Sequence, residues 1–460
     1  MTGGGGRLSW FMTRRSRLGR LTPPQLIALV YTVGSLLGAL ALWSPLARAP
    51  GQELGFVTAL FTATSALCVT GLTVVDPATT FSAFGEVVLL LLFQIGGLGI
   101  ISFGTLFALV AGRRVGFGER LRLAQQVNAM EVGGVLPLLR SIVLSTLAIE
   151  GIGAALLFTR MGPEEGLARG LYSAVFHAVS AFTNAGFSLY PEGLGRYAAD
   201  PVVVGTAGVL IVLGSLGFLV LANVWAWRRD PRRQPLLTHT RIVLLMTAVL
   251  VAVGTLGIAT MEWTNPRTLG ELTIGDRLLA SVFHSVTPRS GGLSTLDFGA
   301  MRPATLLLVI VLMFIGGSPG STGGGIKTTT FYVLAVSAWS LVRGHGEPTA
   351  FRRRIDTDTI VRAAVVTVLS LGLLNLLLVA LLLTNPRLGF LDLLFEAVSA
   401  FGTVGLSLGA TPHLNPAGQL VIVLMMLLGR IGPLTFALAL RTPGTRSPVT
   451  YPAERNILIG

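Results

Sequence analysis

A short segment that ends in a glycine turn occurs four times in this sequence. The first copy is Phe61-Thr-Ala-Thr-Ser-Ala-Leu-Cys-Val-Thr-Gly-Leu-Thr73, and the later copies begin at residues 176, 283 and 395, about 110 residues apart. A regular repeat must be identified first, because it determines how the whole chain is divided. Each copy has glycine at the turn: Gly71, Gly186, Gly292 and Gly405. Backbone carbonyls from four such turns around one axis could replace the hydration shell of a cation.

The residues around each turn glycine are the candidate ligands of that cation. Glycine is needed at the turn because a carbonyl ring requires backbone angles that a β-carbon penalises. A short helix is expected before each turn, and the negative end of its dipole would face a cation on the axis. The predicted selectivity filter takes three residues from each copy: Val69, Thr70, Gly71, Asn184, Ala185, Gly186, Ser290, Gly291, Gly292, Thr403, Val404 and Gly405. Two roles, filter ligand and helix cap, stay open for the threonines at the helix ends, which are Thr70, Thr183, Thr287 and Thr403.

The composition identifies the environment in which these turns lie. Hydrophobic residues make up 52% of the 460-residue chain and charged residues only 12%, whereas a soluble domain has about 25% charged residues. Apolar runs of about 20 residues, long enough to span a bilayer, recur throughout the chain. The net charge of +13 comes from arginines clustered between these runs, which is a topology signal and not a nucleic-acid patch. We therefore expect an integral membrane protein without a nucleic-acid partner.

Each repeat has the same order: a long apolar span, a half-length helix, the glycine turn and a second span. The first unit has spans near 25–44 and 83–111 around a half-helix near 52–66. The later units have their first span, half-helix and second span near 136–160, 169–182 and 200–227, then 240–261, 276–287 and 303–341, then 359–384, 389–401 and 416–440. Backbone that re-enters a membrane is tolerated only where it is buried in protein or lines a watery path. The sequence thus predicts an all-α integral membrane protein in which four tandem repeats, with eight transmembrane helices and four pore half-helices, surround a central pore.

Arginine-rich segments separate the repeats and indicate the topology. They contain Arg113, Arg114, Arg120, Arg122, Arg140, Arg228, Arg229, Arg232, Arg233, Arg343, Arg352, Arg353 and Arg354. By the positive-inside rule, these loops and both termini are cytoplasmic and the glycine turns face outward. The predicted divisions are a basic N-terminus at 1–24, repeat 1 at 25–114, repeat 2 at 136–233, repeat 3 at 239–345, repeat 4 at 359–440 and a C-terminal tail at 441–460. Three acidic residues just beyond the turns either concentrate cations at the outer mouth or are ordinary solvated loop charges: Asp76, Glu192 and Asp297.

The turn motifs resemble those of the Trk/Ktr/HKT superfamily of potassium transporters. The resemblance covers about residues 25–440 and rests on Val-Thr-Gly-Leu-Thr (69–73), Asn-Ala-Gly-Phe-Ser (184–188), Arg-Ser-Gly-Gly-Leu-Ser (289–294) and Gly-Thr-Val-Gly-Leu-Ser (402–407). Two further stretches, Gly316–Phe331 and Gly429–Phe436, make the chain more similar to the Ktr-type membrane subunit than to the longer Trk type. One departure is Gly291, where the family commonly has a slightly larger residue, and little effect is expected from it.

The resemblance implies potassium uptake across the inner cell membrane, with potassium bound at the filter carbonyls and no organic cofactor in this chain. In the family, glycine at the first-repeat filter position accompanies potassium preference, and this chain has Gly71 there. Sodium is a second candidate ion, and the sequence leaves open whether flux is channel-like or coupled to sodium. The implied partners are membrane lipid, a second copy of the chain in a homodimer, and a cytosolic ring of regulatory subunits that binds a nucleotide of the ATP/ADP or NAD type.

A glycine-rich stretch interrupts the apolar sequence over 303–341, which is about twice as long as a membrane span. Each glycine destabilises a helix by about 1 kcal/mol relative to alanine, so the span is expected to break there. In the family the equivalent loop is the gate below the filter. The resemblance therefore implies a gate made of loop 316–327 and Arg430, with the residues Gly316, Gly317, Ser318, Gly320, Ser321, Thr322, Gly323, Gly324, Gly325, Lys327 and Arg430.

Three charged residues are expected inside the membrane region. Lys327 is the only lysine in the chain. Arg430 lies in the middle of the last predicted span, where a charge costs about 2.5–3.5 kcal/mol, so a functional role is expected. Arg289 precedes the third turn, and we expect it to pair with a neighbouring carboxylate or, less favoured, to lie nearer the ion.

Two motifs offer rival interpretations. Gly316-Gly-Ser-Pro-Gly320 fits G-x-S-x-G, so an intramembrane serine hydrolase using Ser318 is the rival class. That chemistry needs a histidine base. Two histidines fill a repeat position that is Thr or Glu in the other copies, and the remaining three lie in expected loops: His177 and His284, then His239, His345 and His413. The stretch from Gly320 resembles a phosphate-binding loop, but Ile326 separates glycine from lysine and no strand precedes it, so nucleotide binding is not expected there.

Overall fold

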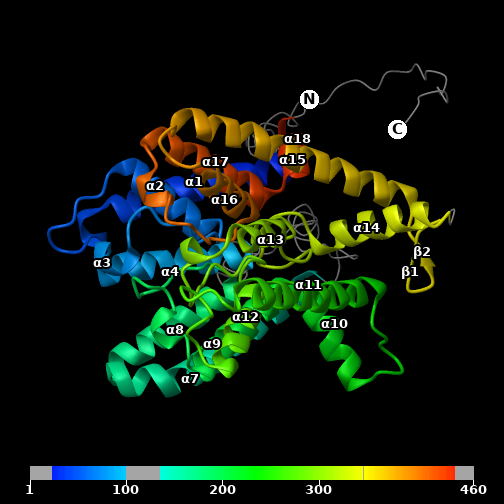
Figure 1. The fold of residues 1–460 in the computed structure, drawn as a ribbon, viewed down its shortest axis with the longest axis horizontal. Coiled ribbons are helices and arrows are strands. Elements are labelled where there is room, and N and C mark those ends of the chain that lie inside the picture. The colour runs from blue at the N-terminus through cyan, green and yellow to red at the C-terminus, as the bar shows by residue number, and fades with distance from the viewer. Residues whose placement is uncertain (1–22, 100–134, 345–346, 441–460) are drawn as a thin grey trace, which may run out of the picture.

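The computed structural model describes residues 23–99, 135–344 and 347–440, which fold into one helical bundle (Figure 1). The only strands among these residues are β1 (Thr349–Ala350) and β2 (Arg353–Arg354), which pair as a hairpin. The N-terminal arginines, the arginines at 113–122 and the C-terminal tail lie outside the described residues. The predicted sidedness of the termini therefore stays a prediction.

Four repeats of a long helix, a short helix and an inner helix follow one another along the chain. In repeat 1 these are α1 (Pro23–Trp43), α2 (Phe56–Leu67) and α4 (Ala83–Leu98). The corresponding helices are α7 (Val135–Glu165), α8 (Leu167–Thr183) and α9 (Pro201–Leu216), then α11 (Thr238–Glu262), α12 (Ile274–Val286) and α13 (Pro303–Phe314), then α15 (Thr357–Thr384), α16 (Phe390–Gly402) and α17 (Pro416–Ile431). Single turns connect them: η2 (Pro45–Ala47), α3 (Pro77–Thr80), η3 (Gly195–Tyr197), η4 (Phe298–Ala300) and η5 (Thr411–His413). The short helices are the half-helices that the sequence predicts.

The first helix of each repeat is long enough to span a bilayer. Among the described residues, the helices that are long and apolar enough to cross a membrane on their own are α1, α7, α11 and α15, with 20 to 28 residues in the apolar segment. They expose large apolar side chains, including Leu37, Leu147, Leu256 and Val368. A membrane is the solvent in which such surfaces are stable, so the all-α membrane fold with repeats is confirmed.

The inner helices are shorter than the sequence predicts. Continuous second spans are expected over 83–111, 200–227 and 416–440, but α4, α9 and α17 end before glycines with positive φ. These are Gly99 (φ 83°), Gly217 (φ 93°) and Gly432 (φ 88°). Residues that carry a β-carbon rarely adopt such angles. After the break, α10 (Phe218–Arg229) is turned by 100° from α9, and α18 (Pro433–Leu440) follows α17.

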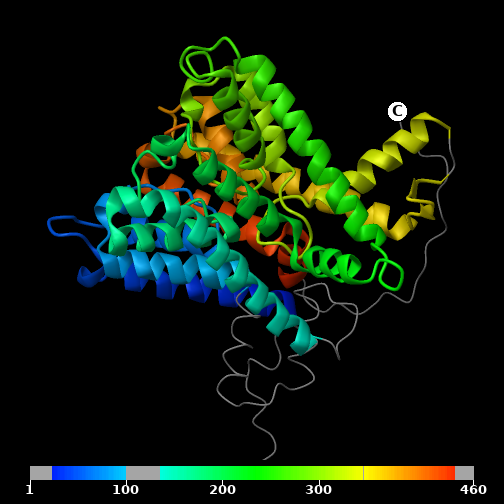
Figure 2. The same ribbon diagram turned by 90° about the horizontal axis from the view of Figure 1, so that it is seen from below.

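The third inner helix is broken by a longer insertion, as predicted. The chain leaves α13 at Phe314 and re-enters a helix at α14 (Thr328–Val342). Ile315 and Ile326 form a parallel bridge at the base of the insertion, so the loop between them is closed at its neck. Helix α14 and the β1–β2 hairpin project from one side of the bundle, which both Figure 1 and Figure 2 show.

A Gly-x-[Leu/Ile]-Gly pattern precedes each single-residue break: Gly96–Gly99, Gly214–Gly217 and Gly429–Gly432. The first glycine of each pattern lies against the carbonyl end of a short helix. A β-carbon there would collide with the carbonyl oxygen of Leu67, Phe182 or Phe401, respectively. Small residues allow helices to approach closely in a membrane. These glycines therefore fix the inner helices directly against the ends of the short helices.

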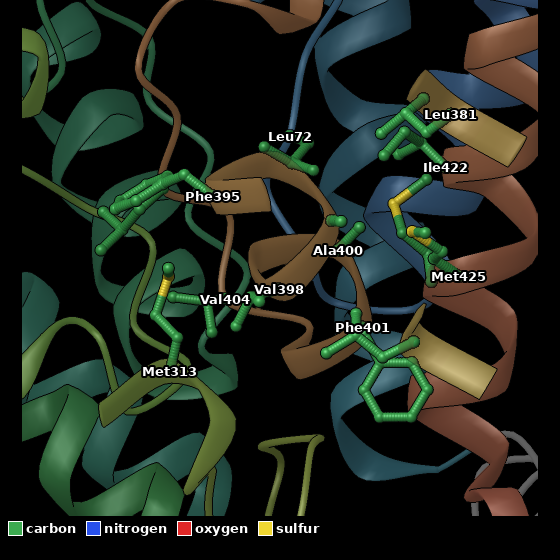
Figure 3. Close-up of a cluster of buried hydrophobic side chains, with 14 of the residues drawn as sticks. Leu72, Met313, Leu381, Phe395, Val398, Ala400, Phe401, Val404, Ile422 and Met425 are labelled. Carbon is green, nitrogen blue, oxygen red and sulfur yellow. The ribbon is translucent and has the colours of Figure 1, made fainter. Parts of the chain in front are cut away.

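The repeats close into a ring. Each inner helix packs against the short helix of the following repeat: α4 on α8, α9 on α12, α13 on α16, and α17 back on α2. The last of these contacts includes the side chains of Thr58 and Gln419, whose oxygens are 3.4 Å apart. The largest apolar cluster surrounds α16 and joins repeats 1, 3 and 4, with Leu72, Met313, Phe401 and Met425 among its members (Figure 3). The four short helices consequently end around one axis.

Candidate functional site: a ring of four glycine turns

The four turn glycines meet at that axis, each against the turn of the next repeat. A β-carbon on Gly71 would lie 2.6 Å from the carbonyl oxygen of Ala185, and one on Gly186 would lie 2.9 Å from the Cα of Gly292. A β-carbon on Gly292 would lie 2.5 Å from the carbonyl oxygen of Val404. One on Gly405 would collide with the carbonyl oxygen of Thr70, which closes the ring. Three carbonyl oxygens of the predicted filter thus lie close to a turn glycine of a neighbouring repeat.

The first predicted filter residue of every repeat also has a positive φ, although none is glycine. The values are 59° for Val69, 62° for Asn184, 83° for Ser290 and 48° for Thr403. The turn glycine two residues later is positive as well, with φ between 67° and 95°. In an extended chain successive carbonyls alternate in direction, and left-handed residues at every second position turn them toward one side. The sequence gives no signal for this conformation at a valine or threonine, which rarely adopt it.

Hydroxyl groups of the short helices hydrogen-bond to the turn segment in three of the repeats. Ser65 Oγ accepts a hydrogen bond from the backbone N–H of Gly71 at 3.0 Å, and Ser399 Oγ accepts one from Gly405 at 3.1 Å. In repeat 2 the equivalent hydroxyl, that of Ser180, donates instead to the carbonyl of Phe187 at 2.7 Å. All three hydroxyls lie in the protein interior, where an unpaired polar group is unfavourable. They therefore fix the turns on the short helices.

The threonines at the helix ends fall into two groups. Thr183 Oγ1 donates to the carbonyl of Val179 at 2.7 Å, so it is bonded within its own helix. The hydroxyls of Thr70, Thr287 and Thr403 are buried and have no hydrogen-bond partner among the described residues. None of these four hydroxyls hydrogen-bonds to the glycine turn that follows it, among the described residues. For Thr70, Thr287 and Thr403, the role of ion ligand stays a prediction.

A cavity of about 340 Å³ opens on one side of the ring, the side predicted to face outward, and is lined by all four turn glycines. Asp76 and Asp297 also line it. Each of these carboxylates accepts a backbone N–H, from Ala78 at 3.1 Å and from Gly299 at 2.8 Å, so both also cap short helical turns. Glu192 is exposed and is not part of the cavity lining. The structure therefore brings two of the three predicted acids to the mouth.

In each repeat the segment that follows the turn glycine is called here the outer arm. In repeat 2 this arm is held by two tyrosine–carboxylate hydrogen bonds beside the cavity. Tyr190 donates its hydroxyl to Glu165 at 2.6 Å, and Tyr197 donates to Glu164 at 2.8 Å. Burial, and next the bonded Glu164 carboxylate, raise the pKa of Tyr197 to about 12. Tyr197 therefore stays a neutral donor at physiological pH. Sequence reasoning missed this pair because its members come from different segments.

The glycine-rich loop lies on the opposite side of the ring from the cavity. A β-carbon on Gly323 would lie 2.9 Å from Ser290 Oγ, and one on Gly324 would collide with the Thr403 side chain. The side-chain amide of Asn184 is 2.9 Å from the Thr322 hydroxyl. The first residue of the predicted filter therefore contacts the loop in three repeats.

The loop is hydrogen-bonded to the broken inner helix of repeat 2. The backbone N–H groups of Ser318 and Thr322 donate to the carbonyls of Ser215 and Gly214 at 3.0 and 3.2 Å. In return, the N–H of Phe218 donates to the Gly320 carbonyl at 3.1 Å. These bonds use the backbone groups that the break at residue 217 leaves without helical partners. The break in α9 and the loop therefore form one structure.

Two cationic side chains hold the loop from below. Arg430 donates to the carbonyl oxygens of Thr322 and Gly96 and, at 3.3 Å, to the Tyr31 hydroxyl. Lys327 Nζ donates to the Gly323 carbonyl at 2.6 Å. Arg430 was expected in mid-span, but it lies in the last turn of α17, because the helix ends at Ile431. Its guanidinium reaches the loop and the end of α4 at once.

Arg289 does not have the carboxylate partner that the sequence led us to favour. It is 2% exposed, and its guanidinium Nη2 donates a hydrogen bond to Thr247 Oγ1 at 3.2 Å, within the described part of the chain. Its Nε has no hydrogen-bond partner there. The interaction is therefore between Arg289 and helix α11 of its own repeat.

The chain is similar over nearly its full length to known transport proteins. It matches the family model TrkH, described as cation transport protein, over residues 9–446. It is 42% identical over 433 residues to Ktr system potassium uptake protein B of Bacillus subtilis, covering 94% of this chain and 96% of that protein. It is 36% identical over 445 residues to potassium/sodium uptake protein NtpJ of Enterococcus hirae, covering 96% and 98%. The crystal structure of the potassium transporter TrkH from Vibrio parahaemolyticus has the same fold, with a TM-score of 0.72 at 18% identity over 94% of this chain and 88% of that chain.

Four membrane-embedded repeats closed into one ring define a polytopic transport protein. The chain belongs to the TrkH family of cation transport proteins. The expected similarity to Ktr-type membrane subunits is confirmed by two such relatives at 42% and 37% identity. This family consists of transporters and not enzymes, so the serine hydrolase alternative is wrong. Consistently, the Ser318 hydroxyl is paired with the Thr328 hydroxyl at 3.0 Å and contacts no histidine among the described residues.

Proposed function

We propose that the chain takes up potassium ions through the ring of glycine turns, which acts as its selectivity filter. The observation that carries this proposal is that each turn lies against the next repeat's turn, with the carbonyl oxygens of Thr70, Ala185 and Val404 at the contacts. Carbonyl rings of this kind replace the hydration shell of potassium. The names of the Ktr relatives support potassium as the ion. Within this proposal, the four functional units are the repeats at 25–114, 136–233, 239–345 and 359–440.

Electrostatics support a cation at this position. Helices α2, α8, α12 and α16 end within a few residues of the turn glycines, so four negative dipole ends face the ring, each equivalent to roughly half an elementary charge. The carboxylates of Asp76 and Asp297 at the mouth add to the negative potential. Both terms raise the local concentration of cations at the outer side of the filter.

The glycine-rich loop is proposed as the gate. It lies against the inner side of the filter and is held by Arg430 and Lys327. Arginine presents a planar fork of donors and keeps its charge, so it both fixes loop carbonyls and opposes a passing cation. The gate would consist of the glycine, serine and threonine residues of 316–325 together with these two cations. In this arrangement the loop closes the pathway.

The remaining parts of the proposal concern partners and location. The names of the Ktr relatives call them proteins of a Ktr system, which supports a separate partner subunit. We further propose that the chain forms a homodimer in the inner cell membrane on a cytosolic regulatory ring that binds ATP/ADP or NAD. The termini would be cytoplasmic. Sodium is proposed as a second ion because one relative is named a potassium/sodium uptake protein. No organic cofactor is proposed for this chain.

The test of the filter is Gly71→Ser. At φ 95° and with a β-carbon 2.6 Å from the Ala185 carbonyl, serine must displace one quarter of the ring. We expect the preference for potassium over sodium to fall while the pathway still conducts. Rubidium uptake into liposomes, competed by potassium or sodium, measures this. The matched control is Gly372→Ser, at an exposed glycine of α15 with open space around its β-carbon position. An unchanged ion preference in folded Gly71→Ser protein would refute the filter assignment.

A further inference from the structure

The second residue of the repeated segment is buried and polar in every copy. It is Thr62, His177, His284 or Glu396, and each is at most 1% exposed. We propose that His177, His284 and Glu396 are positioning residues that hold the outer arm of three filter turns through hydrogen-bond acceptor atoms. This inference rests on the proposed filter and names residues behind it that contact no ion.

The hydrogen bonds of His177 determine which of its ring nitrogens accepts. Nδ1 is 2.8 Å from the carbonyl oxygen of Ser173. A carbonyl only accepts, so Nδ1 carries the proton and Nε2 is the acceptor of a neutral imidazole. Nε2 lies 3.0 Å from the Ser188 hydroxyl and 3.3 Å from the backbone N–H of Leu189. Both donors belong to the arm that leaves the filter at Gly186.

His284 has the same arrangement in repeat 3. Its Nδ1 is 2.9 Å from the carbonyl of Ala280, which again makes Nδ1 the donor and Nε2 the acceptor. Nε2 accepts from the backbone N–H groups of Thr295 and Leu296 at 3.4 and 3.2 Å. The imidazole thus accepts two N–H groups of the non-helical segment that follows Gly292.

Glu396 performs the equivalent role with a carboxylate. It accepts from the hydroxyl of Ser407 and, at 2.6 Å, from that of Thr411. Ser407 and Ser188 occupy the same position of the repeat. Each of these serine oxygens also accepts a backbone N–H two residues further on, from Gly409 at 2.9 Å and from Tyr190 at 3.0 Å. The same relay therefore connects short helix, serine and arm in repeats 2 and 4.

Repeat 1 lacks this connection. The Thr62 hydroxyl donates to the Thr58 carbonyl of its own helix at 2.9 Å. Among the described residues its hydroxyl makes no hydrogen bond to the arm that follows Gly71. Thr62 is therefore a control position of the same burial and repeat register, at which the proposed effect should not occur.

The arms determine where the filter carbonyls lie, because each arm begins at the turn glycine. Moving an arm away from the buried acceptor would leave the N–H or O–H donors of the arm unpaired, which is unfavourable. The acceptor therefore holds the arm in place. Loosening the arm lets carbonyls move toward a smaller or larger ion, so discrimination falls before conduction does. Selectivity is therefore the property that these residues control.

The experiment compares acceptor-removing and acceptor-keeping variants in the full-length protein. His177→Leu and His284→Leu remove the acceptor at similar size, whereas His177→Gln and His284→Gln retain a side-chain oxygen. Potassium-over-sodium preference is measured by rubidium uptake into liposomes with each competitor. We expect the leucine variants to lose about fivefold to tenfold of the preference, as the loss of one buried hydrogen bond implies. The glutamine variants should recover most of it, and Thr62→Val should behave as the unmodified protein.

Several outcomes would overturn the proposal. Leucine variants with unchanged preference, or glutamine variants as impaired as leucine, would show that no acceptor is required. If a leucine variant fails to fold, the glutamine variants are compared with the unmodified protein by the rise in melting temperature that potassium and sodium each produce, which needs no transport. A glutamine variant that loses the difference between the two ions contradicts the proposal. Gly71→Ser in the same assay distinguishes failure of this inference from failure of the filter assignment. If Gly71→Ser alters ion preference and the leucine variants do not, only the positioning role is refuted. If neither alters ion preference, the filter assignment is refuted.

Discussion

Single hydroxyls in the short helices set the position of two turn glycines. Ser65 and Ser399 accept the N–H of Gly71 and Gly405 at 3.0 and 3.1 Å. Replacing either serine by alanine leaves that N–H buried and unpaired, which costs on the order of 1–3 kcal/mol. We expect Ser65→Ala and Ser399→Ala to lower the melting temperature and reduce ion preference. The control is Ser145→Ala on α7, whose hydroxyl only returns to the Ile142 carbonyl of its own helix. Equal melting curves for all three variants would contradict the bracing role.

Residue types predicted the turn glycines but not their neighbours. Gly71, Gly186, Gly292 and Gly405 are identifiable because glycine is the residue that tolerates a positive φ. Val69 and Thr403 adopt positive φ as well, and β-branched residues give no indication of it. Their conformation comes from tertiary packing around the ring, because both are fully buried. The positive φ angles at these two positions could therefore be recognised only from the structure.

At the scale of elements, Arg430 links three segments that are far apart in the sequence. It joins the end of α17 to Thr322 of the loop and to Gly96 of α4. Removal of its fork should free the loop and remove a positive barrier near the axis. We expect Arg430→Ala, or deletion within 320–325, to raise rubidium uptake and weaken dependence on a regulatory partner. Arg430→Lys should give a partial effect, because it keeps the charge. Lower uptake by folded Arg430→Ala protein would instead assign these residues to support of the open pathway.

The breaks in the inner helices allow a matched comparison. Gly217 and Gly432 have nearly the same backbone angles, so alanine strains both, by about 1–3 kcal/mol. A β-carbon on Gly217 would lie 2.8 Å from the Pro319 carbonyl of the loop, whereas one on Gly432 has 3.9 Å to its nearest contact. We expect both alanine variants to melt earlier, but only Gly217→Ala to change rubidium uptake by the folded protein. Matching uptake in the two variants would mean that the α9 break does not position the loop.

Hydropathy predicted the half-helices well and the inner helices poorly. The short helices lie within a few residues of their predicted ranges because a glycine turn ends each one. The second spans were predicted as continuous because Leu98, Leu216 and Ile431 keep the sequence apolar up to each break. A single glycine in an apolar segment is usually a packing residue. Its role as a helix end depends on backbone angles, which composition does not report.

At the scale of the whole molecule, closure of the ring within one chain is testable by cross-linking. Thr58 of α2 and Gln419 of α17 touch across the junction of repeats 1 and 4. With cysteines at both positions, a short bifunctional thiol reagent should join the two thiols within one chain. Under denaturing conditions the product should then have the mass of one chain plus one reagent, while each single variant stays unlinked. The native Cys68 is buried and should not react. Products of twice the chain mass would show that the ring is completed between chains. Under mild detergent the same samples should run at the mass of the proposed homodimer.

Because one polypeptide supplies all four quarters of the ring, the quarters are free to differ. A substitution in a four-chain channel appears in every subunit, and its effect on the pore is multiplied by four. In this chain a single substitution changes one quarter of the ring only, so its effect on the ring is not multiplied. The buried position before each turn illustrates the result, with Thr62, His177, His284 and Glu396 at equivalent places. A lineage can therefore adjust its ion preference in small, separately selectable steps.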